Sequence, residues 1–527
     1  MRRAVVGARR AVVGARRAAR QAVVAGAALC AVACRAAPPP PPAGTLVVAL
    51  ESTPAVLDPR YTTDANSSLV SALVTTGLTA TDARGEAVPD LAAAWREISP
   101  LEYLFTLRPD ARFHDGTPVI SADVAATYRS VLDPALRSPK REALVAIESI
   151  TTPDPETVVF RLREIFAPFL ETTNLGILPA RLTAAGPVPR PEVVGAGPFR
   201  VAGVGTDGGV DLEAHGGYMG GVPRIARLRF RVVPDGVVRA LELASGTVHL
   251  VENALDPDVL PWLARQPGLE LVISPGTTFQ YLGMNFRDPR LADRRVRQAF
   301  AYALDREAVV HHVLRDTARP ATGLLPPSHW AYEGEVATYA HDPAHAAALL
   351  RESGLGAEAA LDLRRFSYKT STVELRRRIA EVFQSDLMTI GLSLDIRSYE
   401  WATLYEDIRR GNFQLYALAW VGVTDPDVYF RIFHSAMRPP AGNNRGEYAN
   451  AAIDALLEEA RRTLDRAARR RLYAEVQRLA ADDLPVVPLW WTDNVVVKSR
   501  ALVDFTPAPD GDLRSLATAR FDGPAAR

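Results

Sequence analysis

The chain has 527 residues, a length that predicts about three domains at roughly 150 residues each. Hydrophobic residues make up 48% and charged residues 23%, a balance typical of folded soluble proteins that excludes wholesale disorder, a collagen-like chain and a coiled coil. Lys+Arg and Asp+Glu each number 61, so the formal charge of zero does not indicate a basic nucleic-acid binder.

The N-terminal segment has the features of an export signal. Residues 1–33 carry seven arginines and no acidic residue. The stretch from Gln21 to Cys34 contains 14 uncharged residues, which as a helix would extend about 21 Å, short of the roughly 30 Å hydrocarbon core of a membrane. We therefore predict a signal peptide over residues 1–33 rather than a permanent membrane anchor.

The cleavage end of this signal resembles the lipobox of bacterial lipoproteins, in which a cysteine is acylated. Its sequence is Ala31-Val-Ala-Cys34, with alanine where that motif prefers leucine. The resemblance implies that Cys34 is lipidated and holds the protein at the membrane. Cleavage by an ordinary signal peptidase is the alternative, and Cys34 then has no role. Residues 34–44, with prolines at 38–42, are predicted to form a stiff tether.

The chain contains two cysteines, and at most one of them remains after cleavage. An internal disulfide, a cysteine cage for a metal and Cys–His catalysis are therefore excluded. No later segment approaches 18 unbroken apolar residues, so we predict no further membrane span.

In the N-terminal half of the mature chain, the pattern predicts short strands and turns. Thr45–Leu50 is a buried-strand run, and residues 86–112 alternate strands with turns. A helix is expected to begin at Ser121. Asp115-Gly116 follows a strand, which predicts a turn with His114 packed beside it rather than a catalytic His–Asp pair.

The C-terminal half alternates helices with strands. Caps, stops and apolar spacing predict helices after Asp305 and Asp342, around Ile379–Leu387, over Trp401–Arg410, and after Asn450 and Asp465. Strands are expected over Leu392–Ile396, Phe413–Trp420 and Leu484–Trp491. The alternation over residues 371–420 predicts βαβ units and a mostly parallel sheet, which places the chain in the α/β class.

The loop after the predicted strand 413–420 is the strongest candidate for a ligand site. Trp420, Asp425 and Asp427 follow the carboxyl end of this strand, and in open α/β sheets that edge faces the ligand crevice. An aromatic ring with two carboxylates suits a cationic group or a polar solute. The alternative is a turn in which Trp420 is core and Asp425 caps the next helix. Asn444 and Arg445 lie in a polar loop downstream, which either approaches the same crevice or is a solvated turn.

Enzyme motifs are not visible in the sequence. It contains no G-x-S-x-G elbow, no H-E-x-x-H and no phosphate loop of the Gly-Lys-Ser/Thr kind. Two histidine pairs, His311-His312 and His341 with His345, offer no third ligand nearby in the sequence and are read as helix polarity. We therefore expect no catalytic residue, no metal site and no cofactor.

A set of short motifs in colinear order resembles the family 5 extracellular solute-binding proteins, the dipeptide and oligopeptide binders of ABC importers. The similarity covers about residues 45 to 500. The motifs are Leu57-Asp58-Pro59, Pro89–Ala92 with Trp95, Phe113–Pro118, Gly195–Phe199, Asn285-Phe286, Val296–Ala299, Ala303–Arg306, and Trp420 with Asp425-Pro-Asp427. Motifs that keep their order over this length are a specific signal.

The resemblance implies a two-lobed periplasmic-binding-protein clamp of the cluster C type that closes about a hinge. The first lobe is discontinuous and is expected to comprise residues 45–65, 179–280 and 490–520. An accessory domain is expected over 66–178, and the second lobe over 282–489. The clamp would enclose its solute between the lobes and then dock on a permease.

One position departs from the pattern of the peptide-binding members. They usually carry an aspartate three residues after the tryptophan, which pairs with the ammonium group of the peptide, and here that residue is Val423. Asp425 or Asp427 would have to replace it. A cation for a solute carboxylate would be Arg365 or Lys369, on the preceding segment. Thr278, Phe279 and Tyr281 lie where such chains cross into the cleft.

The resulting prediction is an extracytoplasmic or periplasmic binding protein rather than an enzyme. It would deliver a peptide or another small polar solute to the permease and ATPase subunits of an ABC transporter. A secreted hydrolase with an unrecognised site and a sensory solute-binding module are the alternatives. Nickel, haem, oligosaccharides and opines stay open as solutes, because the family serves many solutes on one scaffold. No nucleic-acid partner is expected.

Overall fold

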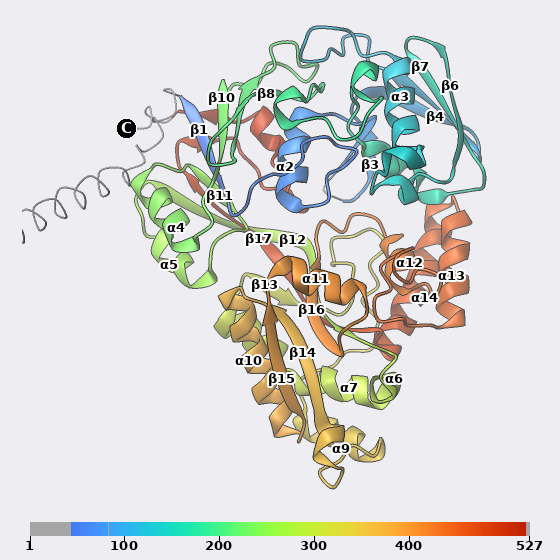
Figure 1. Ribbon diagram of the computed structural model, residues 1–527, viewed down its shortest axis with the longest axis vertical. Helices are drawn as coiled ribbons and strands as arrows, with labels where there is room; N and C mark the ends of the chain where they lie inside the picture. The colour runs from blue at the N-terminus through green and yellow to red at the C-terminus, as the bar shows by residue number, and fades with distance from the viewer. Residues whose placement is uncertain (1–43, 83, 523–527) are drawn as a thin grey trace, which may run out of the picture. The chain divides into compact units, whose positions relative to one another are not determined.

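A computed structural model describes residues 44–82 and 84–522 (Figure 1). The predicted signal peptide, Cys34 and nearly all of the predicted tether lie outside the described residues. Among the described residues, no helix combines the length and the apolar character that a membrane span requires.

A mixed sheet of 11 strands runs through the described chain. Ten strands follow one another by hydrogen bonding, and β13 (Ala318–Pro320) pairs with β17 beside them. In spatial order they are β15 (Ser393–Tyr399), β14 (Arg365–Ser371), β16 (Leu415–Trp420), β12 (Leu269–Met284), β17 (Val486–Ser499), β11 (Leu250–Glu252), β1 (Thr45–Leu50), β10 (Arg227–Val232), β9 (Val210–Ala214) and β8 (Phe199–Val204).

The predicted parallel pairing is confirmed between residues 365 and 420, where β14 pairs in parallel with both β15 and β16. The rest of this half differs, because β12 pairs antiparallel with β16 and with β17. Local periodicity detects the βαβ units but carries no information about which distant strand completes the sheet.

Strands β12 and β17 are unusually long and pair with each other over most of their length. Their register shifts between Ser274 and Thr278 and again between Gln280 and Tyr281. Such irregularities bend a strand and increase its twist. The predicted lobe boundaries, after residues 280 and 489, fall within these two strands, which would make them the connection between the lobes.

A separate sheet of four antiparallel strands occupies the N-terminal half, and helix α3 (Ser121–Leu132) lies against it (Figure 1). Its order is β4 (Ala92–Ser99), β5 (Glu102–Leu107), β7 (Thr157–Leu162) and β6 (Ile147–Asp154). Phe105, Phe160 and Phe169 form its aromatic core with Tyr128 from the helix. Two short strands, β2 (Thr79–Thr81) and β3 (Ala87–Pro89), form a hairpin beside it. The strand-and-turn pattern and the helix start at Ser121 are confirmed.

The predicted C-terminal helices are also confirmed, with caps at Asp342, Asn450 and Asp465. Asp305 caps only a short helix, which continues as a π-helical turn over Val309–Val313. The helices of the whole described chain are α2 (Ala65–Val74), α3, α4 (Gly236–Ser245), α5 (Leu260–Leu263), α6 (Pro289–Ala292), α7 (Arg294–Ala303), α8 (Arg306–Ala308), α9 (Pro343–Glu352), α10 (Glu374–Thr389), α11 (Trp401–Arg409), α12 (Val428–Phe433), α13 (Ala451–Arg462) and α14 (Arg466–Asp483).

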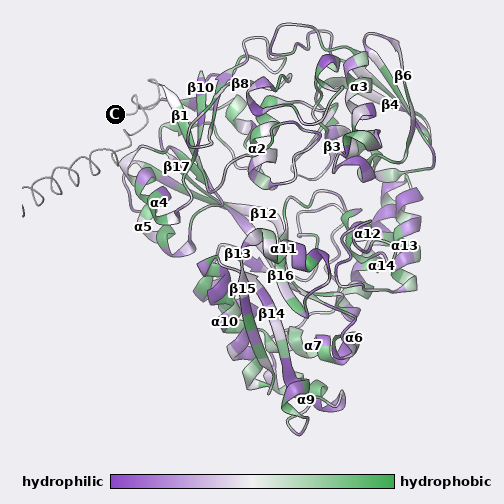
Figure 2. Ribbon diagram, viewed as in Figure 1, coloured by the Kyte–Doolittle hydropathy of each residue, from purple (hydrophilic) through white to green (hydrophobic). Residues whose placement is uncertain are grey.

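The helix pair α13 and α14 shows how patterning directs packing. Both helices mix hydrophilic and hydrophobic residues along their length (Figure 2). Ile453 and Leu457 of α13 and Tyr473 and Val476 of α14 are fully buried in one cluster. Because apolar residues at helical spacing lie on one face, the charged residues between them stay toward solvent.

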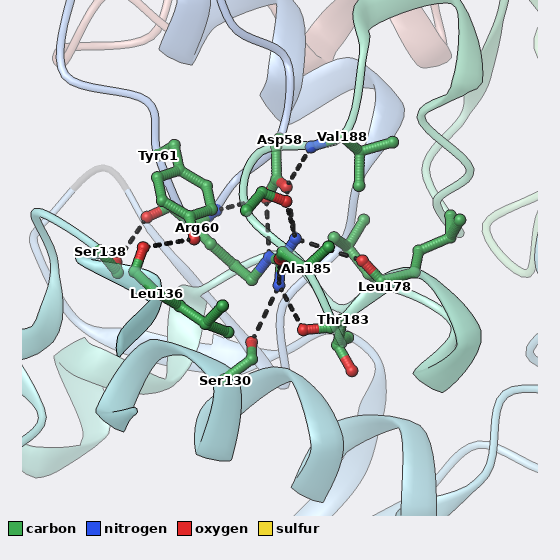
Figure 3. A network of polar contacts seen from close by, with 12 residues as sticks. Asp58, Arg60, Tyr61, Ser130, Leu136, Ser138, Leu178, Thr183, Ala185 and Val188 are labelled. Carbon is green, nitrogen blue, oxygen red and sulfur yellow. Dashed lines mark hydrogen bonds and ion pairs between the residues drawn. The ribbon is translucent and has the colours of Figure 1, made fainter. Parts of the chain in front are cut away.

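A buried ion pair explains why the segment Leu57-Asp58-Pro59 is distinctive (Figure 3). The side chains of Arg60 and Asp58 are 1% and 0% exposed, and they are joined by two hydrogen bonds of 3.0 and 2.7 Å. Arg60 also donates to the Ser130 hydroxyl at 3.1 Å and to the Thr183 carbonyl at 3.0 Å, and Asp58 accepts from the Val188 amide at 3.0 Å. The pair therefore joins three distant segments.

The motifs around His114 and Gly195 pack against each other. The His114 amide donates to the Gly195 carbonyl at 2.9 Å, and the Gly195 amide donates to His114 Nδ1 at 3.2 Å. A Cβ atom on Gly195 would lie 2.1 Å from the Val74 carbonyl oxygen, so only glycine fits. Gly116, at φ +84°, makes the predicted turn. The structural interpretation of His114 is confirmed.

Candidate ligand-binding site

A cavity of about 300 Å³ lies among segments that are far apart in the sequence. We call it the main cavity. Its walls come from residues 81–85, 328–329, 423–424 and 506–515, together with Thr277. The volume is at the lower end of the range for small-molecule sites. The cavity therefore has room for a compact solute, and it combines residues from both halves of the chain.

The loop after β16 contributes Val423 and Thr424 to the main cavity. Val423 is 4% exposed and apolar, so this part of the wall carries no charge. Charged side chains come from other parts of the wall: the carboxylates of Asp82, Asp510 and Asp512, and the guanidinium groups of Arg84 and Arg514. Arg514 pairs with Asp512 at 2.5 Å. Burial raises the pKa of Asp510 above its usual value, and the nearby Asp512 carboxylate raises it further.

A buried carboxyl group, Glu252, stands at the end of β11 beside these acids. Among the described residues, neither of its carboxylate oxygens has a hydrogen-bond partner. Burial, followed by the charges of Asp512 and Asp510, raises the pKa of Glu252 to about 9. Glu252 therefore keeps its proton at neutral pH and adds no negative charge beside Asp510 and Asp512.

The raised pKa of Glu252 predicts a pH-dependent stability. Between its usual pKa and about 9, the folded state holds a proton that the unfolded state has released, so stability falls as pH rises through this window. We expect Glu252→Gln to melt at a higher temperature than the wild type at pH 8 and at about the same temperature at pH 4. Thermal unfolding at both values tests this. Glu270→Gln is the control, because hydrogen bonding to Lys498 lowers the pKa of Glu270.

Five of the predicted site residues come together around a second cavity, here called the aromatic cavity. It has about 20 Å³, enough for one water molecule. Trp420 pairs with Phe279 across the β16–β12 ladder and stacks on Tyr281, with ring centroids 6.3 Å apart. The other two predicted residues in its wall are Asn444 and Arg445 of the polar loop. Trp420 itself is half-buried.

The polar loop contains two of the predicted site residues, Asn444 and Arg445. Asn444 donates to the His434 carbonyl at 3.2 Å and to the Tyr448 carbonyl at 2.7 Å, so its amide group stabilises the loop. Arg445 is 8% exposed, lies over the Trp420 ring at 4.9 Å and donates to the Tyr281 hydroxyl at 2.9 Å. Arg445 therefore supports the indole from the side of the aromatic cavity.

Asp425 and Asp427 already have cationic partners. Asp425 lies 3.5 Å from the Arg469 guanidinium, and Asp427 lies 2.9 Å from Arg461. Neither residue lines the main cavity. Burial raises the pKa of Asp427 to about 7, and Arg461 opposes this shift. Both carboxylates face the helices α13 and α14 and are occupied there.

These acids belong to a contact between the N-terminal half and the C-terminal helices. The Arg461 guanidinium lies 4.8 Å from the centre of the Phe166 ring, and Glu86 pairs with Arg466 at 2.7 Å. Burial, and then the Asp425 carboxylate, hold the pKa of Glu171 well above its usual value. The contact closes one side of the main cavity, where Gly85 approaches Thr424.

The two cations predicted to bind a solute carboxylate, Lys369 and Arg365, also form ion pairs within the protein. Lys369 is 8% exposed and pairs with Asp407 at 2.6 Å, with the Tyr399 ring 5.1 Å away. Arg365 is exposed and lies 3.8 Å from Asp395. Neither lines the main cavity, and Thr278 does not line it either.

Several wall residues were not predicted from the sequence, namely Asp82, His329, Asp510, Asp512 and Arg514. The segment 506–515 is rich in Pro, Gly and Asp and has the composition of a turn. That composition does not indicate a binding site. A long-range contact joins the segment to β12 at the main cavity: the Pro509 carbonyl accepts from the Thr277 amide at 3.0 Å. This pairing spans more than two hundred residues of sequence.

Comparisons with known proteins agree over nearly the whole described chain. The family model for bacterial extracellular solute-binding proteins, family 5, matches residues 86–438. The dipeptide-binding protein of Escherichia coli is 28% identical over 480 residues, which cover 84% of this chain and 89% of that protein.

Two solved structures have the same fold. The oligopeptide-binding protein AppA from Bacillus subtilis, in complex with a nonapeptide, is similar with a TM-score of 0.80 and 24% identity over 90% of this chain and 98% of that one. NikZ from Campylobacter jejuni, in complex with Ni(L-His), is similar with a TM-score of 0.81 and 24% identity over 90% of this chain and 99% of that one. The same architecture thus holds very different solutes.

Proposed function

Because the chain belongs to the bacterial extracellular solute-binding proteins of family 5, we propose that it binds a short peptide or a similar small polar solute and delivers it to an ABC importer. The observation that carries the proposal is the main cavity of about 300 Å³, whose wall includes the loop after β16. The dipeptide-binding protein of Escherichia coli, similar over 84% of the chain, supports the peptide class.

The transport step follows from a change of population between two states. The predicted lobes, 45–65 with 179–280 and 490–520 on one side and 282–489 on the other, would turn about β12 and β17. A solute that contacts both sides of the main cavity binds the closed state more tightly, and so it shifts the population toward closure. The closed form would then be the one that the permease subunits recognise.

The wall of the main cavity carries three carboxylates against two arginines, which favours a solute with a cationic group. Val423 offers no charge, and Asp425 and Asp427 are paired with Arg469 and Arg461. Asp82 and Asp510 line the main cavity and are the carboxylates in reach of a peptide ammonium group there. In this proposal they replace the aspartate that peptide-binding relatives carry after the tryptophan.

A thermal-shift screen tests the proposed function. The purified chain is mixed with peptides of two to six residues, free amino acids, sugars and metal ions. A ligand at 100 times its dissociation constant adds about 2.7 kcal/mol of stability, which raises the melting temperature visibly. A shift with peptides supports the proposal. A shift only with other solutes contradicts the peptide class, and product formation from any peptide or glycoside would indicate a hydrolase.

We also propose that Cys34 carries a lipid anchor on the extracytoplasmic side of the membrane. The small residues before Cys34 support this, as does the Arg-rich, acid-free segment 1–33. Cys34→Ser is expected to move the protein from the membrane fraction to the soluble fraction after export. Cys30→Ser, four residues earlier in the signal, is the matched control and should leave the distribution unchanged. A wild-type protein that is already soluble would contradict the anchor.

A further inference from the structure

A contact between the predicted accessory domain and the predicted second lobe, here called the acid contact, holds more acids than bases. The accessory domain contributes Glu171, from the 3-10 segment Ala167–Asn174 that packs on α13. The second lobe contributes two carboxylates and two guanidinium groups, those of Asp425, Asp427, Arg461 and Arg469. Because Glu171 is a further acid, the contact has one more carboxyl group than it has arginines.

Both arginines of the acid contact are engaged by the aspartates. Arg461 lies 2.9 Å from Asp427. An Arg469 nitrogen lies 3.5 Å from each carboxylate oxygen of Asp425, and these two side chains are only 7% and 12% exposed. Glu171 forms no ion pair within the described chain, and its buried Oε2 has no hydrogen-bond partner there. Glu171 is therefore the acid without a counter-ion of its own.

The other titratable groups around the acid contact do not provide that counter-ion. Arg466 of α14 pairs with Glu86 at 2.7 Å. His329 is neutral, because its Nδ1 accepts from the Ala331 amide at 3.1 Å and burial lowers its pKa. The remaining groups are the exposed Arg431 of α12 and three hydroxyls whose pKa is raised by burial, those of Tyr103, Tyr128 and Tyr473. A proton is therefore the available means of neutralising Glu171.

Closing the acid contact favours the protonated form of Glu171. A carboxyl group that is buried beside another carboxylate does not keep its charge easily. Burial, and then the Asp425 carboxylate, hold the pKa of Glu171 well above its usual value. When the contact opens, Glu171 faces water, where a glutamate has a pKa of about 4.3. At neutral pH the closed contact thus holds a proton that the open one has released.

The position of the acid contact couples it to the solute site. Asp425 directly follows Thr424, which lines the main cavity. On the other side, the buried Arg60 donates both to Ser130 of the accessory domain and to the Thr183 carbonyl of the predicted first lobe (Figure 3). The accessory domain is therefore fastened to the first lobe, and a turn of the two lobes apart would separate Glu171 from Asp425.

We propose that closure of the clamp takes up one proton from solvent at the Glu171–Asp425 pair, so that the protein holds its solute more tightly at acidic than at alkaline pH. The inference rests on the proposed function, because it adds a proton to the closure that the solute drives. Between the pKa values of the open and closed states, each unit of pH changes the apparent affinity by up to about tenfold. A rise in pH would thus favour opening and release.

Hydrogen–deuterium exchange tests the acid contact without any solute. The purified full chain is compared with Glu171→Gln, whose side chain stays neutral, at pH 5.5 and pH 7.5. The comparison is made at equal pH, so the chemical effect of pH on exchange cancels. For the amides of residues 167–174, we expect the ratio of the wild-type rate to the Glu171→Gln rate to rise at least about tenfold between the two pH values, because exchange follows the open population.

Two further variants sharpen the comparison. Glu164→Gln is the matched control, because Glu164 is exposed and lies seven residues before Glu171. It should exchange like the wild type at both pH values. Asp425→Asn should remove the pH dependence as Glu171→Gln does, because a charged Glu171 could then pair with Arg469. Circular dichroism confirms that each variant is folded.

Peptide binding then tests the link to the solute. The probe is a mixture of di- and tripeptides, read by thermal shift. The wild type and Glu164→Gln should bind it at least about tenfold more weakly at pH 7.5 than at pH 5.5, and Glu171→Gln should lose this dependence. An exchange ratio that stays constant with pH overturns the proposal, and so does a Glu171→Gln variant whose binding keeps the wild-type dependence. If the exchange ratio rises but the wild type binds no peptide at either pH, the peptide function is wrong and the proton-linked contact stands.

Discussion

Asp58→Asn is expected to lower the free energy of unfolding by about 3–5 kcal/mol, the range for removing one partner of a buried ion pair. The change keeps the size of the side chain but leaves the Arg60 guanidinium charged, with a side chain only 1% exposed. It also weakens the acceptor of the Val188 amide. Urea unfolding followed by circular dichroism measures the loss.

The matched control is an ion pair of the same chemistry on the surface. Glu148 and Arg161 are 45% and 60% exposed, and their closest atoms are 3.1 Å apart. Glu148→Gln should cost less than about 1 kcal/mol, because exposed pairs are weak. If Asp58→Asn costs no more than this control, the network in Figure 3 does not hold the three segments together and our account of the Leu57-Asp58-Pro59 motif is wrong.

Trp420→Ala is expected to weaken solute binding more than tenfold while the protein stays folded. The indole is half-buried, stacks on Tyr281 and lies under the Arg445 guanidinium, three residues before Val423 in the wall of the main cavity. Removing it takes away an aromatic surface and frees the loop that carries Val423. Isothermal titration with a solute identified in the thermal-shift screen gives the dissociation constants.

Trp401→Ala serves as the control for this substitution. Trp401 is 57% exposed on α11 and stacks on Tyr405, away from the main cavity. Its removal should leave the dissociation constant within about twofold of the wild type, a change of less than roughly 0.5 kcal/mol. If Trp420→Ala behaves in the same way, Trp420 is a packing residue, as the alternative interpretation of the sequence had it.

Local elements were predictable because their signals lie within a few residues. Asp342 and Asn450 cap helices because their short side chains accept hydrogen bonds from nearby backbone amides. In the sequence, each of them directly precedes a run of apolar residues at helical spacing. Strand β17 extends to Ser499, past the predicted end at Trp491. The polar residues Asp493 and Lys498 lie within the additional part of the strand, where they pair with Arg319 and Glu270 from elsewhere in the chain.

The candidate site was only partly predictable. The carboxyl edge of β16 does lie at the main cavity, as the order of elements indicated, and Val423 lines it. The acids after Trp420 could not be assigned from the sequence, because their partners, Arg461 and Arg469, come from helices more than thirty residues away. Asp510 was missed for the same reason. Its significance depends on which charges lie nearby in space, and no sequence spacing encodes that.

The most direct test of the central claim is to identify the solute that the protein retains. The purified full chain is incubated with a complex peptide hydrolysate to which sugars and amino acids are added, separated from unbound material by gel filtration, and denatured. Mass spectrometry then identifies what is released. We predict short peptides at close to one per chain, and almost none from Trp420→Ala. Release of a sugar or amino acid without peptides, from a folded wild-type chain, would contradict the claim.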